Sequence, residues 1–275
     1  MSHSRVSCFN GCPAQYKYKY IDELTLIEKW EFQNDSLFGS AIHRGLQVHY
    51  QGGDVSKVKE AFKEVYSSDL SPADEAKSLE GGLLCLEAYI AHYREMDKDW
   101  RVIETELKDT VLNGEDSHNL VVDLIAEHIP SKTIYAWDHK TVGAEKMKYG
   151  FWKRYELDAQ VTMYTEYIRQ KYGSCAGFYV NAIAVGHRKR MYKGEPAGYY
   201  QRFERNLFER SDEQIDAWKK SDSEWRALMD YAMASGSYPK ALNGLCGYCE
   251  FQQLCLSADN EQVKEIMYQQ KKKAV

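Results

Sequence analysis

Thr133-Ile134-Tyr135-Ala136-Trp137-Asp138-His139-Lys140 joins β-branched and aromatic residues to a charged end. Residues of the first two kinds favour a strand. Side chains two positions apart on a strand face the same side, so the Asp138 carboxylate and the Lys140 ammonium would project together from one face. We expect the polar end of this strand to organise the rest of the chain.

The run from Leu120 to Ala126 also has the composition of a strand, and residues 129–132 between the two runs have the composition of a turn. A hairpin centred between Pro130 and Ser131 would put Asp123 opposite Asp138, with Cβ atoms about 5 Å apart. Two carboxylates that close repel each other unless a cation lies between them, and hard oxygen ligands suit Mg²⁺ or Mn²⁺. The alternative is a surface hairpin whose acidic pair is solvated.

Composition indicates a globular protein with one elaborated domain. The chain has 275 residues, of which 44% are hydrophobic and 28% charged. No apolar run approaches the roughly 20 residues needed to span a bilayer, and the first residues lack an apolar signal core, so we expect an intracellular, cytoplasmic protein without a membrane partner. A net charge of -5 argues against a uniformly basic nucleic-acid binder. A local basic track would still suffice for a nuclease.

Hydrophobic periodicity predicts several further elements. Residues 100–109 alternate as a strand, with Glu104, Glu106 and Lys108 on one side, so a three-stranded meander is expected. Ser211 to Gln214 form a capping box that opens a long helix. The other expected helices cover residues 36–51, 54–67, 71–93 and 155–172, and the other expected strands cover residues 177–185 and 199–207.

Two basic segments could contact nucleic acid. Near the N-terminus aromatic and basic residues alternate, and Tyr16, Lys17 and Tyr20 could offer rings for stacking and ammonium groups for phosphates. The alternative for this segment is a short amphipathic strand or the start of a helix. The tip of the predicted C-terminal hairpin carries Arg188, Lys189 and Arg190.

The cysteines are unevenly spaced. Cys246, Cys249 and Cys255 follow a CxxC spacing with a third thiol five residues beyond the second. This clustering favours one tetrahedral metal ion or an iron–sulfur cluster, either of which needs a fourth thiolate. Cys12 is the best candidate and Cys8 competes with it. Cys85 and Cys175 have apolar surroundings and are expected in the core.

With these motifs in order, the sequence resembles the RecB-type branch of the PD-(D/E)XK nuclease superfamily, and specifically its iron–sulfur members, such as the CRISPR-adaptation exonucleases and the AddB nuclease domain. Cys12-Pro13 resembles the family's N-terminal cysteine segment, which favours Cys12 over Cys8. The other matching segments are Gly39 to His43 (the metal-binding histidine helix), Asp123 (the second-motif aspartate), Asp138-His139-Lys140 (the D-x-K motif) and Gln160 to Tyr164 (the Q-x-x-x-Y motif).

The resemblance implies an α/β (α+β) fold with a mixed central β-sheet flanked by helices, a restriction-endonuclease-like core, and a cysteine-ligated cluster that joins the N- and C-terminal segments. One nuclease domain would cover residues 1–275. Its expected parts are cluster-binding segments at 1–35 and 240–260, a helical insertion at 36–98 that carries His43, a catalytic core at 99–210 and a long helix at 211–235.

The resemblance also implies a mechanism and ligands. His43, Asp123 and Asp138, with the main-chain carbonyl of His139, would hold Mg²⁺ or Mn²⁺, and Glu104 or Glu106 could add a carboxylate. Lys140 would orient the attacking water or stabilise charge. Gln160 and Tyr164 would contact the substrate or Lys140. Cys12, Cys246, Cys249 and Cys255 would ligate a 4Fe-4S cluster, with Zn²⁺ as the alternative.

The function expected is a metal-dependent DNA exonuclease that prefers single-stranded DNA or free ends and acts in recombination, repair or DNA processing. The competing hypothesis is a catalytically silent DNA-binding or scaffold protein with a structural Zn²⁺ site. Cleavage polarity, protein partners and oligomeric state are not encoded in any motif that we identify.

Overall fold

A computed structural model of the protein describes residues 1–27, 32–66, 74–148, 150–175, 177–191, 193–194 and 196–271. The chain forms two compact units. The sheet unit comprises Glu31–Val111 and Leu120–Ile215, and the terminal unit comprises Met1–Trp30, Leu112–Asn119 and Asp216–Val275. The assignment of residues 1–275 to one nuclease domain, with the subdivisions expected above, stays a prediction.

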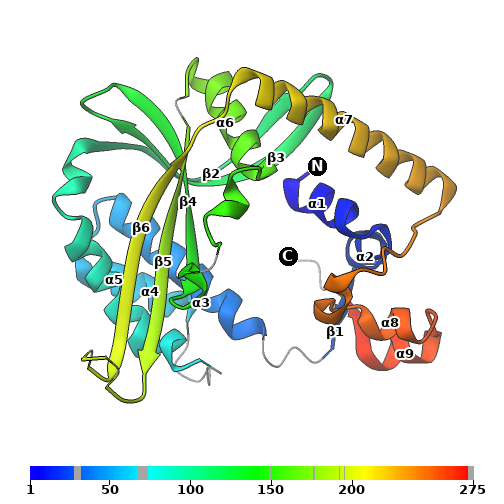
Figure 1. Ribbon diagram of the computed structural model, residues 1–275, viewed down its shortest axis with the longest axis horizontal. Helices are drawn as coiled ribbons and strands as arrows, with labels where there is room; N and C mark the ends of the chain where they lie inside the picture. The colour runs from blue at the N-terminus through cyan, green and yellow to red at the C-terminus, as the bar shows by residue number, and fades with distance from the viewer. Residues whose placement is uncertain are drawn as a thin grey trace. The chain divides into compact units, whose positions relative to one another are not determined.

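A five-stranded mixed sheet forms the centre of the sheet unit (Figure 1). Its order is β2-β3-β4-β5-β6, with β3 antiparallel to β4, β4 parallel to β5, and β5 antiparallel to β6. A parallel pair needs a crossover connection, and helix α6 lies in the one between β4 and β5. The strands are β2 (Trp100–Asn113), β3 (Asp116–His128), β4 (Thr133–Gly143), β5 (Phe178–Arg188) and β6 (Gly198–Phe208).

The β3–β4 hairpin has the predicted register. Its pairs run from His128 opposite Thr133 to Leu124 opposite Trp137, which is the register of a hairpin centred between Pro130 and Ser131. Lys132, the last turn residue, has φ of 58°, a left-handed conformation that closes the turn. Both predicted strands of this hairpin are confirmed.

Three helices pack on one face of the sheet. They are α3 (Phe32–Tyr50), α4 (Val55–Val65) and α5 (Leu79–Tyr93). Phe38, Phe62 and Tyr89 from these helices are fully buried with Ile183 and Val185 of β5 in one hydrophobic cluster. This cluster anchors the helix that carries His43.

The caps of these helices correct two predicted boundaries. The Asp54 side chain accepts a hydrogen bond from the Lys57 N–H, and α4 ends at Val65 rather than at Ser67. Helix α5 begins at Leu79, and the Ser78 hydroxyl accepts a hydrogen bond from the Gly81 N–H. Ser71, where the sequence predicts the start of this helix, and Ser67 lie outside the described residues.

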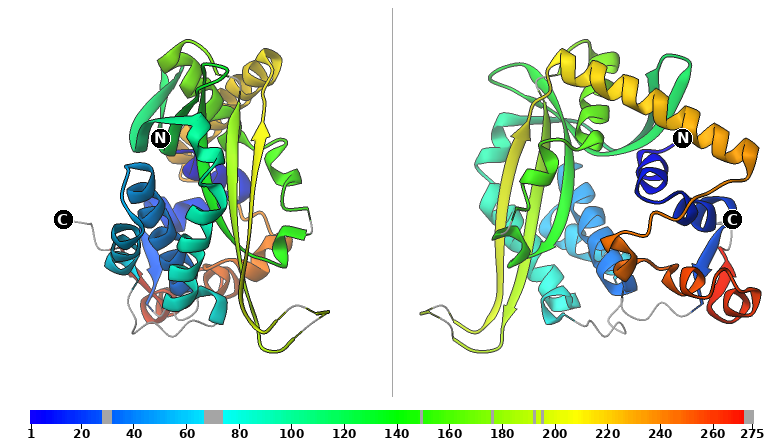
Figure 2. Two further views of the ribbon diagram at one scale, coloured as in Figure 1. Left: turned by 90° about the vertical axis from the view of Figure 1, so that its left-hand side faces the viewer. Right: turned by 45° about the vertical axis from the view of Figure 1, so that its right-hand side comes forward.

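Helix α6 (Ala159–Tyr172) packs on the opposite face (Figure 2). Its Tyr164 ring lies 5.2 Å from the Phe178 ring, and strand alternation puts Phe178 on the face opposite Ile183. The Asp158 carboxylate accepts from the Gln160 N–H, so the helix starts there rather than at Tyr155. The sheet is thus flanked by helices on both faces, as expected.

The terminal unit consists of short elements. A two-stranded antiparallel sheet pairs Leu24 with Gln270 and Leu26 with Tyr268, and it joins segments from the beginning and the end of the chain. The unit contains α1 (His3–Gly11), α2 (Pro13–Tyr16), a π-helix (Lys17–Ile21), β1 (Leu24–Leu26), a 3₁₀-helix (Gly244–Tyr248), α8 (Gln252–Leu256), α9 (Glu261–Met267) and β7 (Tyr268–Gln270).

Helix α7 (Asp212–Ser235) begins in the sheet unit and continues in the terminal unit. Its predicted capping box is confirmed: the Ser211 N–H donates to Gln214 Oε1 at 2.9 Å, and the Gln214 N–H donates to the Ser211 hydroxyl at 3.3 Å. Within the described residues, no helix is both long enough and apolar enough to cross a bilayer.

Candidate functional site

Three side chains of the sheet unit form a group that could hold a metal ion. His43 of α3, Glu106 of β2 and Asp123 of β3 each offer one ligand atom, and these atoms lie within 4.8 Å of one another. His43 Nδ1 is 3.4 Å from Asp123 Oδ2. Within the described part of the chain, no other three His, Cys, Asp or Glu side chains come this close.

A close approach of helix and strand positions His43. A Cβ atom on Gly39 of α3 would lie 3.2 Å from Thr141 Oγ1 of β4, which is tighter than ordinary van der Waals contact. Glycine therefore lets the first half of α3 lie against β4, one helical turn before His43. This packing gives a physical reason for a glycine four residues before His43.

Glu106 has an unusual backbone conformation within β2. Its φ is 50°, a left-handed value that is uncommon for residues other than glycine. Glu104 and Asp109 both contact Lys171, at 3.2 and 3.3 Å, although regular alternation would put them on opposite faces. The kink at Glu106 thus corrects the regular alternation predicted for residues 100–109, and Glu106 rather than Glu104 reaches His43 and Asp123.

Asp138 and Lys140 form an ion pair at the end of β4. Lys140 Nζ lies 3.0 Å from Oδ1 and 2.7 Å from Oδ2 of Asp138, and Asp138 is 5% exposed. The strand parity predicted this shared direction. The β3–β4 pairing stops one residue short of Asp123, whose Oδ2 instead accepts a hydrogen bond of 2.6 Å from the His139 N–H.

Burial and mutual charge shift the acid–base equilibria of this group. Burial raises the pKa of Asp138 to about 6, although Lys140 opposes the shift. Burial would lower the pKa of His43, but its hydrogen bond to Asp123 and the surrounding carboxylates outweigh burial and raise it to about 9. Burial and the charge of Asp123 raise the pKa of Glu106. At neutral pH His43 therefore retains a proton that a metal ion would displace.

The donor set suits a hard divalent cation. Carboxylate oxygens and one imidazole nitrogen are ligands for Mg²⁺ and Mn²⁺. Within the described residues, the buried Oδ2 of Asp138 accepts no hydrogen bond, although the Lys140 ammonium is near it. This oxygen lies 2.7 Å from Lys140 Nζ, so a metal ion bound there would share it with Lys140 or displace the ion pair. The residues present fit the expected metal.

Gln160 and Tyr164 lie on one face of α6, as predicted. Gln160 Nε2 donates to the Tyr164 hydroxyl at 3.2 Å, and that hydroxyl donates to the Val121 carbonyl at 2.6 Å. Burial raises the pKa of Tyr164 to about 12, so the phenol stays protonated. The hydrogen bond from Tyr164 therefore connects α6 to β3 at Val121, two residues before Asp123.

The four expected cluster ligands line one pocket of the terminal unit. Cys12, Cys246, Cys249 and Cys255 surround a cavity of about 350 Å³. Burial raises the pKa of both Cys249 and Cys255, and the charges of the other thiols add to the effect. Cys8 does not line this pocket and packs in a different cluster. Cys85 and Cys175 are buried, as expected.

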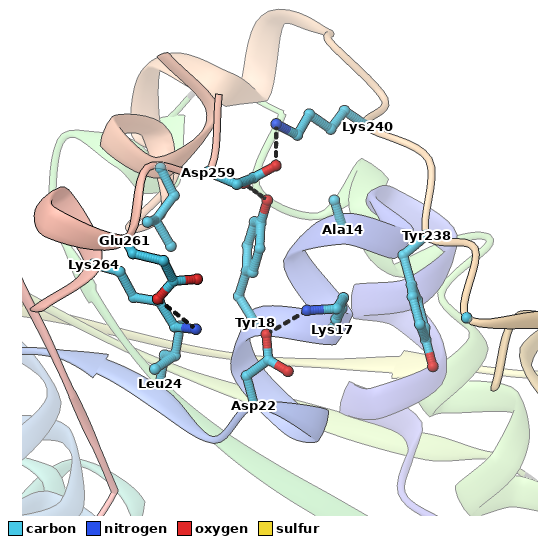
Figure 3. Close-up of a pocket in the computed structure, with 12 residues that line it drawn as sticks. Ala14, Lys17, Tyr18, Asp22, Leu24, Tyr238, Lys240, Asp259, Glu261 and Lys264 are labelled. Atoms are coloured by element: carbon cyan, nitrogen blue, oxygen red, sulfur yellow. Dashed lines mark hydrogen bonds and ion pairs between the residues drawn. The ribbon is translucent and has the colours of Figure 1, made fainter. Parts of the chain in front are cut away.

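The N-terminal aromatic residues do not form the predicted stacking surface. Tyr16 is 2% exposed and packs edge-on against Phe9 at 5.5 Å, so its ring is not available to a base. Lys17 forms an ion pair of 2.6 Å with Asp22, beside the hydrogen bond from Tyr18 to Asp259 (Figure 3). Tyr16 is the last residue of the short helix α2, and the burial of its ring corrects the prediction for Tyr16.

The other residues predicted to bind DNA are Tyr20 of the terminal unit and Arg188, Lys189 and Arg190 of the sheet unit. Tyr20 is half-buried beneath the Arg5 guanidinium, 5.1 Å from its ring centre. At the end of β5, Arg188 stacks over the Tyr200 ring at 3.7 Å. Lys189 and Arg190 follow and are exposed. The hairpin of β5 and β6 therefore ends in a basic tip, as predicted.

The sequence matches the family model of the PD-(D/E)XK nuclease superfamily over residues 1–256. The chain belongs to this superfamily. PD-(D/E)XK nucleases use divalent metals, and among the described residues His43, Glu106 and Asp123 form a group that could hold one. No curated protein matches the sequence.

Three solved structures are similar to this chain in three dimensions, to different degrees. A candidate exonuclease from Eubacterium rectale is 14% identical, with a TM-score of 0.50 over 90% of this chain and 87% of that one. SSO0001 is 15% identical, with a TM-score of 0.30 over 84% of this chain and 88% of that one. LHK-Exo in complex with dAMP is 13% identical, with a TM-score of 0.27 over 74% and 97%. At 14% identity the first likeness concerns the fold alone. The TM-scores of the other two are too low to support any conclusion about this chain.

Sequence reasoning left open which of Glu104 and Glu106 could add a carboxylate to His43, Asp123 and Asp138. Both have the same parity on β2, so alternation could not separate them. The Tyr172 hydroxyl donates to Glu104 at 2.9 Å, and Lys171 also contacts this carboxylate. No sequence signal marked the left-handed turn of the backbone at Glu106.

Proposed function

We propose that this PD-(D/E)XK protein is a Mg²⁺- or Mn²⁺-dependent exonuclease that acts on DNA, with a preference for single strands or free ends, in recombination, repair or DNA processing. The observation that carries the proposal is the convergence of His43, Glu106 and Asp123 within 4.8 Å, beside the Asp138–Lys140 ion pair. This is a metal site with a cation next to it, the arrangement that phosphodiester hydrolysis needs.

The chain's own residues have separable roles in this proposal. His43, Glu106, Asp123 and Asp138, with the His139 carbonyl, would hold the metal, which would supply Lewis-acid polarisation of the phosphate and lower the pKa of the attacking water. The charge of Asp138 raises the pKa of Lys140 against the effect of burial, so Lys140 stays cationic. Its ammonium can orient the water or neutralise charge that develops on phosphate. Gln160 and Tyr164 fix α6 at the edge of the site.

A surface depression beside the metal group offers a path for the DNA backbone. It is lined by Gly39, Ser40, His43, Arg44, Gln47, Glu106 and Lys108. The Arg44 guanidinium is oriented by hydrogen bonds to Gln47 at 2.8 Å and Glu64 at 3.2 Å. Lys108 is exposed and forms no ion pair with the described residues. Arg44 and Lys108 can therefore bind phosphates next to the scissile bond, and Arg188, Lys189 and Arg190 can bind DNA further along.

For the thiol pocket we propose a 4Fe-4S cluster held by Cys12, Cys246, Cys249 and Cys255. A single tetrahedral Zn²⁺ with Zn–S bonds of about 2.3 Å would bring its thiolates within about 4 Å of each other. The described residues include every cysteine, and no three of the four sulfur atoms lie within 4.8 Å of one another. Thiolates that bind different irons of one cluster stand further apart, which favours the cluster over Zn²⁺.

The test uses anaerobically purified full-length protein. It is assayed with end-labelled single-stranded, linear duplex and closed circular DNA, with Mg²⁺ or Mn²⁺ and with a chelator. We expect metal-dependent release of nucleotides from ends, fastest on single strands, and no attack on closed circles. DNA binding without cleavage under every metal condition would instead support the silent DNA-binding protein.

A further inference from the structure

A buried chain of hydrogen bonds leads from the metal group of the sheet unit into the helical core. The Asn181 carboxamide nitrogen is 2.8 Å from His139 Nδ1 and donates to the Tyr89 hydroxyl at 2.7 Å. The Tyr50 hydroxyl lies 2.7 Å from that of Tyr89, and the Arg205 guanidinium donates to both hydroxyls at 2.9 Å. Asn181 and Tyr89 are 0% exposed.

This chain of hydrogen bonds ends at His139, whose backbone belongs to the proposed metal site. The His139 N–H holds the Asp123 carboxylate at 2.6 Å, and the adjacent Asp138 and Lys140 form the ion pair. Tyr50 stacks on the imidazole, with ring centres 5.7 Å apart and an interplanar angle of 7°. Asn181 is also the strand partner of His139 across the β4–β5 pair. The imidazole is therefore held on two sides.

The residues joined by these hydrogen bonds are more polar than those of a core selected for stability alone. Arg205 is nearly buried, and its NH1 lies 2.5 Å from Asp97 Oδ1. Replacement of a buried ion pair by apolar residues is often neutral or stabilising. Hydrogen-bonded partners behind metal ligands, in contrast, orient those ligands, and their loss typically weakens metal binding or activity 10- to 100-fold.

We propose that Tyr89 and Asn181 are positioning residues for the metal site: through the His139 ring they hold the β4 backbone so that the His139 N–H orients Asp123 and the His139 carbonyl faces the ion. The inference rests on the proposed metal-dependent function. It assigns part of the metal affinity to a tyrosine of α5 that itself offers no ligand.

The test compares two substitutions that each remove one buried hydroxyl. Tyr89→Phe breaks the chain, whereas Tyr66→Phe removes a hydroxyl of the same hydrophobic cluster that donates to the Lys77 carbonyl. We measure the dissociation constant for Mn²⁺ from the paramagnetic resonance of free Mn²⁺ without DNA, together with the Mn²⁺ dependence of cleavage. Melting temperatures report the loss of stability for each variant.

We expect Tyr89→Phe to raise the Mn²⁺ dissociation constant about 10-fold and Tyr66→Phe to leave it within about 2-fold, although both lower the melting temperature. Asn181→Leu should raise it further; if that variant does not fold, Tyr89→Phe alone decides. Unchanged Mn²⁺ binding by Tyr89→Phe, or equal weakening by Tyr66→Phe, overturns the inference while the wild-type protein still cleaves DNA. Absence of Mn²⁺ binding by the wild type would overturn the proposed function itself.

Discussion

The carboxylate group of the sheet unit and the thiol pocket of the terminal unit are built on very different supports. His43, Glu106 and Asp123 project from a helix of 19 residues and strands of 14 and 13 residues, which are anchored in a large core. The four cysteines lie on or beside helices of four and five residues. Helices this short are not stable by themselves. The carboxylate group is thus formed without an ion, whereas the thiol pocket would depend on the proposed cluster for its shape.

The largest expected effect is a loss of DNA cleavage without a loss of stability. Asp138→Asn should reduce DNA cleavage by more than about 100-fold, because it removes a metal ligand and the partner of Lys140. Its iron content and melting temperature should stay close to those of the wild type, since the sheet unit is formed without the ion. Cleavage is measured with end-labelled DNA at saturating Mn²⁺, and wild-type turnover would refute the assignment.

Removal of a cluster ligand should have the opposite profile. Cys12→Ser should lose iron and soluble yield, with destabilisation of about 3 kcal/mol or more, by analogy with loss of a cross-link over a long loop. Cys8→Ser is the matched control and should retain about four irons per chain and the brown colour. A colourless wild-type protein that holds one zinc would contradict the cluster, and iron loss in Cys8→Ser alone would contradict the assignment of Cys12 as its ligand.

Glu104 and Glu106 of β2 test whether one particular carboxylate of this strand contributes to metal binding. Glu106→Gln should raise the metal concentration needed for half-maximal cleavage about 10-fold, because a charged ligand becomes a neutral one. Glu104→Gln should change it less than about 2-fold, since Glu104 contacts Tyr172 and Lys171 instead. Metal titrations of both variants give the answer, and equal effects would show that the two carboxylates are equivalent.

Lys108 tests whether the depression beside the metal group binds DNA. Lys108→Ala should reduce the dependence of log affinity on log salt concentration by about 0.7 for single strands, the value for one phosphate contact. Lys98→Ala, which removes an exposed lysine already bonded to Glu95, should leave the slope unchanged. Binding is measured over a range of salt concentrations without metal. An unchanged slope for Lys108→Ala would exclude the contact.

The smallest effect concerns the metal-free carboxylate site. The pKa of His43 is raised from 6.5 to about 9, mainly by Asp123 against the effect of burial, so its pairing stabilises the fold fully below pH 6.5 and is lost as pH rises through about 9. The wild type should lose more melting temperature than His43→Gln between pH 7 and pH 9.5, by roughly 2–4 °C for each kcal/mol. Parallel curves would contradict this coupling.

The sequence was most informative where local rules set the geometry. The turn at residues 129–132 determined the β3–β4 register, and strand parity determined the shared direction of Asp138 and Lys140. It was least informative where a single dihedral or a distant partner decided the outcome. Glu106 reaches the metal group through a left-handed φ, and the Tyr16 ring, at the end of α2, is buried against Phe9. The pairing of Tyr89 with Asn181 arises between elements 92 residues apart, beyond the reach of any local pattern.

The aromatic packing beside Asp138 gives the sheet unit an optical signature. Trp137, the residue before Asp138, stacks on Tyr179 at 4.4 Å and meets Trp100 edge-on at 4.7 Å. Two indoles at this separation couple their electronic transitions, so they produce a circular-dichroism couplet that disappears when their packing is lost. Paramagnetic Mn²⁺ bound at the neighbouring residue would quench Trp137 emission. Occupancy of the site and integrity of the strand that carries it can therefore be followed separately in one unlabelled sample.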